Sequence, residues 1–172
     1  MCEYCGCRGV EPIAELMDEH SALAGEAHQV RQALGAGGRA RTLLLLTRMA
    51  DHLGRHVRRE EAGVFTALRG KGEFLDELSD LEEEHRQLDA VIAALDVAAD
   101  DFDDVVIHLL DDLSAHVERE ELGIFPVSVV TLGAAGWGVV EQARSDSPSF
   151  LLDPGGSDAD RHQQWGGRPA RT

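Results

Sequence analysis

Two ten-residue segments of this chain repeat each other and place ionisable residues where a helix would be expected to carry apolar ones. Residues 56–65 read His-Val-Arg-Arg-Glu-Glu-Ala-Gly-Val-Phe and residues 116–125 read His-Val-Glu-Arg-Glu-Glu-Leu-Gly-Ile-Phe, so seven of ten positions are identical at an offset of 60 residues. A shorter echo relates residues 19–23 to residues 84–88, each beginning with Glu-His and ending with Leu. The repeat predicts two helical hairpins of related sequence, each with one histidine on its first helix and a His-x-x-x-Glu pair on its second.

Apolar residues follow a helical period along four segments. They recur at alternating spacings of three and four residues, which places them on one face of a helix. The segments run from Pro12 to Leu34, from Leu46 to Ala67, from Leu78 to Leu95 and from Val106 to Ile124, where the fourth meets Pro126. Their short connections favour antiparallel neighbours. We therefore predict an all-α fold: an antiparallel up-down four-helix bundle with an irregular C-terminal extension.

The chain divides into three parts. Residues 1–11 form a Cys-rich N-terminal segment and residues 12–127 form the predicted bundle. Residues 128–172 are expected to contain a short helix, from Trp137 to Arg144, and an irregular or disordered tail, because the stretch after residue 144 shows no periodicity.

Composition excludes several classes of partner. With 172 residues, of which 43% are hydrophobic, the chain is large enough for one domain with a core. Lys and Arg number 16 against 32 Asp and Glu, and the net charge of −16 repels phosphate backbones and anionic lipid headgroups. No apolar run approaches the roughly 18–20 residues that span a bilayer, and the N-terminus lacks the features of a signal peptide. We expect no nucleic-acid or membrane partner and a cytoplasmic location.

In each of the four predicted helices a histidine takes a position on the apolar face. The glutamate of each His-x-x-x-Glu pair lies only about 40° further around the axis, on the same face. Ionisable groups in an apolar interior cost on the order of several kcal/mol each if unpaired, whereas a metal centre turns neutral imidazoles and ionised carboxylates into ligands. Four imidazoles and two bridging carboxylates suit a pair of first-row transition metals, iron above all. The predicted ligands are His20, His56, Glu60, His85, His116 and Glu120; the alternative is a buried polar network without metal.

This pattern resembles the hemerythrin-like (HHE cation-binding) family over residues 12–127. The two His-x-x-x-Glu pairs, each followed by a hydrophobic residue and Phe, carry the resemblance. Ferritin-like di-iron bundles instead use Glu-x-x-His on two helices, and that spacing occurs once among these residues, from Glu82 to His85. The resemblance implies two iron ions, joined by an oxo or hydroxo bridge, inside an antiparallel four-helix bundle.

The sequence departs from the oxygen-carrying hemerythrins, which use five histidines with a His-x-x-x-His pair on the third helix. Here Asp89 follows His85 by one turn and Leu81 precedes it, so one imidazole is missing. The chain is more similar to bacterial di-iron proteins with four His and two Glu. That resemblance implies a protein that binds or reacts with O2, nitric oxide or peroxide in stress response or sensing.

Three questions of function stay open at this point. The first alternative is an iron–sulfur cluster repair or iron-donating protein, and the second is a structural metal-binding bundle. Whether the protein is an enzyme is undecided; an enzyme would be an oxidoreductase that consumes peroxide or nitric oxide. A redox protein is a candidate binding partner.

Four residues near the six predicted ligands are candidates for additional ligands or for hydrogen-bond partners of the imidazoles. Glu61 and Glu121 lie about 140° from their histidines and should face away on a regular helix, although hemerythrins take one carboxylate from the position five after a histidine. Asp89 is a candidate ligand, imidazole acceptor or solvent-facing residue. His52 lies one turn before His56 and either approaches the site or lies at its edge with a polar partner.

The three cysteines, Cys2, Cys5 and Cys7, lie within the first seven residues. An odd number of clustered cysteines is not typical of a disulfide framework and fits a reducing compartment. They are candidates for a redox group or a second metal site, although three thiolates are one fewer than a tetrahedral site requires. The alternative is a flexible, reduced tip.

Overall fold

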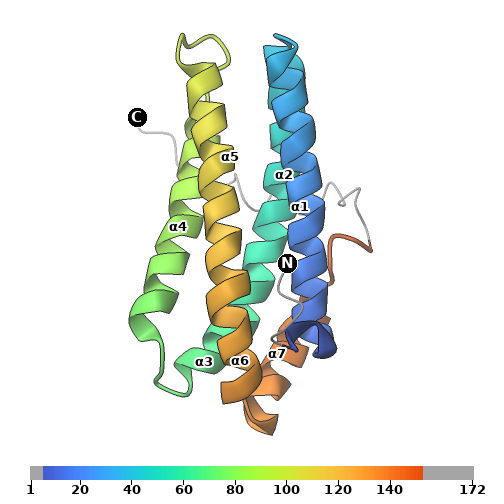
Figure 1. The fold of residues 1–172 in the computed structure, drawn as a ribbon, viewed down its shortest axis with the longest axis vertical. Helices are drawn as coiled ribbons and strands as arrows, with labels where there is room; N and C mark the ends of the chain where they lie inside the picture. The colour runs from blue at the N-terminus through green and yellow to red at the C-terminus, as the bar shows by residue number, and fades with distance from the viewer. Residues whose placement is uncertain (1–5, 153–172) are drawn as a thin grey trace, which may run out of the picture.

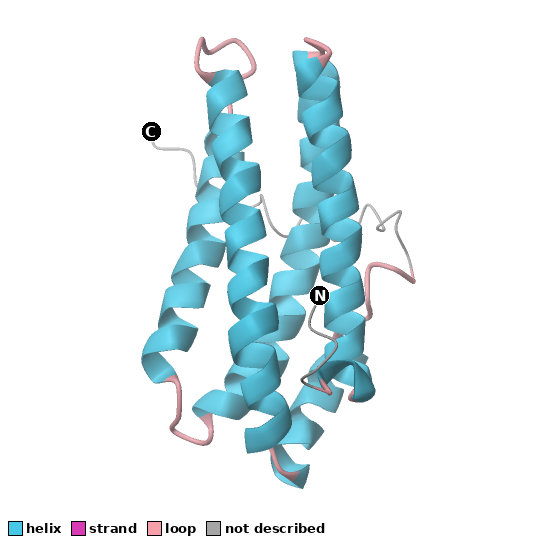
Figure 2. Ribbon diagram, in the orientation of Figure 1, coloured by secondary structure: helices cyan, strands magenta, loops and turns pink. Residues whose placement is uncertain are grey.

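The computed structural model describes residues 6–152, which contain helices and turns and no strand (Figure 2). No helix in this range is long and apolar enough to cross a membrane. In chain order the elements are η1 (Cys7–Gly9), α1 (Glu11–Gly35), α2 (Arg39–Glu60), η2 (Glu61–Phe65), α3 (Thr66–Arg69), α4 (Leu75–Ala94), α5 (Phe102–Arg119), η3 (Glu120–Ile124), α6 (Phe125–Thr131) and α7 (Ala134–Asp146).

Two antiparallel helical hairpins lie side by side, as the repeat predicted (Figure 1). The first hairpin, residues 11–69, consists of α1 and of α2 with its continuation through η2 and α3. The second hairpin, residues 75–131, consists of α4 and of α5 with its continuation through η3 and α6. Pro12 lies in the first turn of α1, where its missing N–H costs nothing. The predicted all-α bundle is confirmed.

Each hairpin contains a π-helical turn that the sequence pattern did not predict. These turns, η2 and η3, follow the two His-x-x-x-Glu pairs and differ by one residue in their position within the repeat. A π turn closes i→i+5 hydrogen bonds and so adds one residue to a helical turn. In η2 the Glu61 carbonyl oxygen accepts the backbone N–H of Thr66, and the Thr66 hydroxyl donates to the same oxygen at 2.7 Å.

The apolar pattern of the fourth predicted helix meets Pro126, and the helix does not stop at this proline. The helical path continues through η3 into α6, which has the proline in its first turn and ends at Thr131. Proline interrupts a regular helix because it lacks an N–H and its ring meets the carbonyl four residues before. The π turn that ends at Ile124 already breaks the regular hydrogen-bond register, so the proline begins a new helical segment instead of ending the rod.

The core consists of two apolar clusters, with a layer of histidines and glutamates between them. Within α1, Leu16 belongs to one cluster and Leu23 to the other, and His20 lies between them. The same order recurs on α4, where His85 lies between Leu81 and Leu88. Apolar side chains therefore enclose the ionisable layer from both ends of the bundle.

The helix α7 packs on the first hairpin, against η2, α3 and α1. It is longer than the predicted Trp137–Arg144 segment and contacts η2 at Gly63, where an added Cβ would lie 3.3 Å from the Ala143 Cβ and 3.6 Å from the Val140 Cα. Gly123 is the equivalent residue of the second hairpin, and no atom lies within 4 Å of an added Cβ there. The predicted tail from residue 153 onward lies outside the described residues.

We expect Gly63→Ala to stabilise the protein less than Gly123→Ala. Alanine gains about 1 kcal/mol over glycine in a helix interior. Gly123→Ala should keep most of this gain, whereas Gly63→Ala should lose it because the new methyl group pushes against α7. Urea unfolding of the metal-free variants measures the difference, and equal free energies of unfolding would contradict the packing described for α7.

Candidate metal centre

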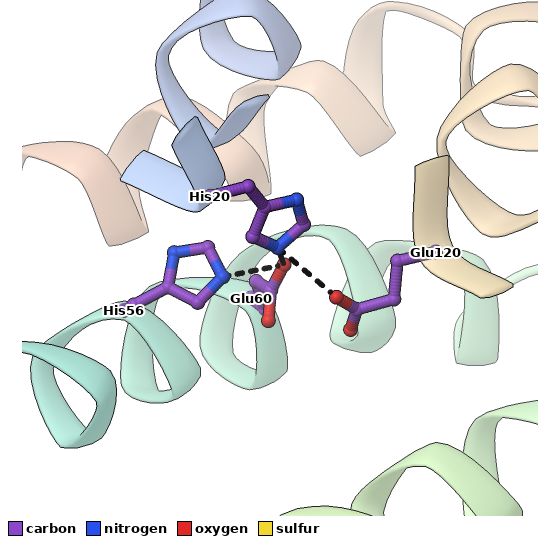
Figure 3. Close-up of side chains that lie close together, drawn as sticks. All are labelled: His20, His56, Glu60 and Glu120. Atoms are coloured by element: carbon purple, nitrogen blue, oxygen red, sulfur yellow. Dashed lines mark ion pairs between the residues drawn. The ribbon is translucent and has the colours of Figure 1, made fainter. Parts of the chain in front are cut away.

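The first group of potential metal ligands consists of His20 from α1, His56 and Glu60 from α2, and Glu120 from η3 (Figure 3). The Nε2 atom of His56 lies 3.1 Å from Glu60 Oε1, and the Nε2 atom of His20 lies 3.6 Å from the same oxygen. His20 Nε2 is also 3.2 Å from Oε2 of Glu120, which reaches in from the second hairpin. All four side chains are buried. One metal ion could be held by this group.

The second group is built from the second hairpin in the same way and shares both glutamates with the first. His116 Nε2 lies 3.2 Å from Glu120 Oε1, and His85 Nε2 lies 3.7 Å from that oxygen and 3.7 Å from Glu60 Oε2. The Nε2 atoms of these two imidazoles lie 2.9 Å apart. The structure therefore brings all six predicted ligand residues together at the centre of the bundle, in two overlapping groups.

Each shared glutamate directs one oxygen toward each histidine pair. Glu60 places Oε1 near His20 and His56 and Oε2 near His85. Glu120 places Oε2 near His20 and Oε1 near His85 and His116. Carboxylates in this position suit a bridge between two ions, because both oxygens have a metal position within reach.

The donor atoms themselves fit a metal pair. Both oxygens of Glu60 and Glu120, together with the Nε2 atoms of His20 and His56, are buried and have no hydrogen-bond partner within the described range. Unpartnered polar atoms in an apolar interior are costly. Imidazole nitrogens and carboxylate oxygens are ligands of first-row transition metals, so a metal pair would satisfy the atoms that the protein leaves without partners.

The opposite nitrogen of every imidazole has its own carboxylate partner. A ligating histidine commonly donates its other ring N–H to a carboxylate, which fixes the ring and leaves the ligand nitrogen free. The Nδ1–oxygen pairs are His20–Glu121 at 3.3 Å, His56–Glu19 at 2.7 Å, His85–Glu61 at 2.9 Å and His116–Glu84 at 2.8 Å. All four imidazoles are thus oriented with Nε2 toward the centre.

The expectation that Glu61 and Glu121 face away from the site is wrong, and the π turns explain why. It assumed a regular helix, whereas η2 and η3 widen the turn after each His-x-x-x-Glu pair. The consecutive glutamates of each hairpin therefore both reach inward, and the second one contacts a histidine of the other hairpin: Glu61 contacts His85 and Glu121 contacts His20. These residues act as partners of the imidazoles.

Two phenylalanines of the repeat make a further contact between the hairpins. Phe125 stacks on His20, with ring centroids 5.5 Å apart and an interplanar angle of 11°. Phe65 stacks on His85 in the equivalent arrangement, at 5.8 Å and 4°. The conspicuous Phe at the end of each repeat segment thus helps to hold an imidazole of the opposite hairpin.

Sequence reasoning missed Glu19, Glu84 and their arginine partners. Glu19 pairs with Arg59, and Glu84 pairs with Arg119, the equivalent arginine of the second repeat segment. A signal was present in the sequence, because Glu-His occurs at both 19–20 and 84–85, and Arg59 and Arg119 occupy the same position of the two repeat segments. The helical pattern alone could not assign these residues, since Glu19 and Glu84 each contact the histidine on the neighbouring helix and not the one beside them in sequence.

Mutual attraction determines the charge of the metal-free cluster. Burial by itself lowers the pKa of His85, but the carboxylates of Glu120 and Glu61 close to its ring outweigh burial and raise the pKa to about 10. Burial by itself would raise the pKa of Glu120, but the imidazoles of His116, His20 and His85 close to its carboxylate hold the pKa well below its usual range. In the metal-free centre His85 is therefore protonated at neutral pH and Glu120 is ionised.

Metal binding should release protons at pH 7. The raised pKa keeps His85 protonated in the metal-free fold, and a ligating imidazole must be neutral. Metal affinity should therefore rise as the pH rises toward 10. Protonated His85 also stabilises the metal-free fold: this contribution is complete below the ordinary histidine pKa of 6.5 and is lost as the pH rises through about 10. Calorimetric titration with zinc in two buffers of different ionisation enthalpy measures the released protons; identical heats would contradict the prediction.

The remaining candidates lie away from the six residues. Asp89 is exposed on α4. His52 is buried and has a polar partner, since its Nδ1 lies 2.9 Å from Glu26 Oε1. Its ring also stacks on Phe150, with ring centroids 4.6 Å apart. The structure thus separates both residues from the two ligand groups.

Cys7 differs from the expected reduced thiol. It is buried in η1 and disulfide-bonded, so its sulfur offers no thiolate to a metal. Cys2 and Cys5 lie outside the described residues. The prediction that Cys7 contributes a thiolate to a metal site is therefore wrong for the disulfide-bonded protein.

The fold and the site together define a helical-bundle protein with a buried cation-binding centre. Residues 11–128, more than half of the chain, match the hemerythrin family, described as the hemerythrin HHE cation binding domain. The chain belongs to this family, and the resemblance noted from its sequence is confirmed. A search of curated proteins and a search of solved structures gave no match.

Proposed function

We propose that the protein binds a pair of iron ions and uses them to bind or react with O2, nitric oxide or peroxide. His20 and His56 would hold one ion, His85 and His116 would hold the other, and Glu60 and Glu120 would bridge them. The observation that carries the proposal is the division of each glutamate between the two histidine pairs, with one oxygen directed to each. A single metal site would not need this division.

The donor set favours a reactive centre over a purely structural one. Bound iron supplies reversible redox chemistry toward small oxidants. Four imidazoles and two carboxylates give each ion two imidazoles and two carboxylate oxygens, fewer donors than the six of an octahedral site. A structural metal site is normally closed by protein ligands, so incomplete ligation by the protein supports a role in binding small molecules.

The protein's own residues would prepare the site for such ligands. The carboxylates on Nδ1 orient the imidazoles and keep each Nε2 available. The apolar clusters above and below the centre would shield it from bulk water and favour small ligands. The proposal therefore names diatomic molecules and peroxide as the ligand class and includes no large substrate.

Metal analysis of protein from iron-supplemented cells, with its near-ultraviolet spectrum, tests the proposal. Two irons per chain with an iron–oxygen charge-transfer absorption are expected. Rapid mixing with peroxide or nitric oxide then separates the functional classes: repeated turnover indicates an enzyme, and one stoichiometric spectral change indicates a binding or sensing protein. One zinc per chain, or two irons that respond to none of these molecules, would overturn the proposal.

A further inference from the structure

The two histidine pairs differ in how far their carboxylate partners are shielded from solvent. The side chain of Glu19, on His56, is 0% exposed, and that of Glu121, on His20, is 16% exposed. On the other pair, the side chain of Glu61 is 39% exposed and that of Glu84 is 31% exposed. The hairpins repeat each other in sequence, but their two metal positions have different surroundings.

The segment after the bundle packs on the first hairpin and reaches the carboxylate partner of His56 through ion pairs. From α7, Arg144 directs Nε to Glu15 Oε2 at 2.8 Å and Nη2 to Glu11 Oε1 at 2.9 Å. Glu15 also pairs with Arg59, which pairs with Glu19. A continuous chain of ion pairs therefore runs from α7 to the carboxylate that orients His56.

Apolar contacts extend the same cover. Gly63 lies against Ala143 of α7, and the stack of Phe150 on His52 fixes the chain beyond α7 against α2. Phe150 is 2% exposed and belongs to one of the two apolar core clusters. The segment from α7 to Phe150 is thus attached to the first hairpin at Gly63 and again at His52.

The second hairpin is open at the equivalent place. Arg119 is the counterpart of Arg59, and its side chain is 45% exposed where that of Arg59 is 3% exposed. Gly123 is the counterpart of Gly63 and has no atom within 4 Å of an added Cβ. The Arg119–Glu84 pair that supports His116 is therefore exposed to solvent, whereas the Arg59–Glu19 pair that supports His56 is buried.

We propose that α7 makes the two metal positions inequivalent, so that the His85–His116 position exchanges its metal with solvent while the His20–His56 position retains it. The inference rests on the proposed pair of metal positions and adds a positioning role for Arg144. Release of a metal requires an imidazole to swing away while water or a chelator enters, which is a local opening of the fold. Such an opening is easier where the supporting carboxylates already contact solvent.

Zinc is a suitable probe because it is diamagnetic and independent of redox chemistry. The full chain is loaded with two zinc ions, one equivalent is removed with EDTA, and histidine side-chain NMR identifies the imidazoles that have lost their metal. The expected result is loss of metal from His85 and His116, with His20 and His56 still ligated. Release of the second zinc should be about fivefold faster in Arg144→Gln and unchanged in Arg86→Gln, a control whose partner Glu83 lies on the exposed face of α4.

Phe150→Ala provides a second variant outside the ion-pair chain and should also accelerate the slow release alone. Loss of zinc from His20 and His56 first, or equal loss from both pairs, would overturn the inference. An Arg144→Gln variant that leaves the slow release unchanged, or accelerates both releases equally, would overturn it as well. If two zinc ions bind but leave in the wrong order, the proposed iron chemistry stands; if two ions never bind, both proposals fail.

Discussion

Glu60→Ala should abolish binding at both of the proposed metal positions. The side chain offers one oxygen to each histidine pair, so its removal takes a ligand from both positions at once. A ligand present at 1,000 times its Kd stabilises the folded state by about 4 kcal/mol, and this metal-dependent stabilisation should disappear. Metal content and the free energy of unfolding with and without metal measure the loss.

Two further variants make this result interpretable. Glu83→Ala removes an exposed carboxylate of α4 and should bind metal like the unmodified protein. Glu60→Gln retains the shape of the side chain and removes its charge, so it separates loss of ligation from loss of packing. Two metals bound by Glu60→Ala with unchanged affinity would show that Glu60 does not bridge them.

Arg59→Ala should destabilise the metal-free fold by about 3–5 kcal/mol, the usual cost of breaking a buried ion pair from one side. The change leaves Glu19, which is fully buried, without its guanidinium partner. Arg119→Ala removes the equivalent arginine, but because that pair is exposed we expect a cost of less than about 1 kcal/mol. The two residues occupy the same position of the repeat, so each variant is the control of the other.

Urea denaturation of both metal-free variants gives the comparison directly. Equal destabilisation would mean that burial under α7 does not determine the strength of the Arg59–Glu19 pair. Histidine NMR of the same samples would show whether the ring of His56 loses its fixed orientation in Arg59→Ala, as its contact with Glu19 implies.

The bundle and its six inward-facing donors could be predicted because they depend on helical periodicity and on repetition. Each histidine stands where the period of 3.6 residues demands an apolar residue, and this holds in four helices. Glu60 and Glu120 follow from the same regular geometry. The structure brings all six residues to one layer, and binding of metal by them is what the proposed experiments test.

The rest of the site depends on departures from regular geometry and on contacts between helices. The widened turns at η2 and η3 redirect Glu61 and Glu121, and no local pattern in the sequence predicted a π turn. Glu19 reaches His56 across the hairpin, and Arg144 reaches Glu15 from the far end of the chain. Such pairings are properties of the packed molecule, so one helical face at a time does not reveal them.

The reciprocal contacts between the hairpins have the form of a two-fold symmetric dimer interface. Glu61 of the first hairpin contacts His85 of the second, and Glu121 of the second contacts His20 of the first. In an isologous interface, too, each partner gives the contact that it receives. Two copies of the first hairpin would supply the same donor set, four imidazoles and two carboxylates. The ligand residues thus meet as they would at a two-fold interface whose halves are joined by residues 70–74, and a metal bound by both hairpins would also hold the two halves together.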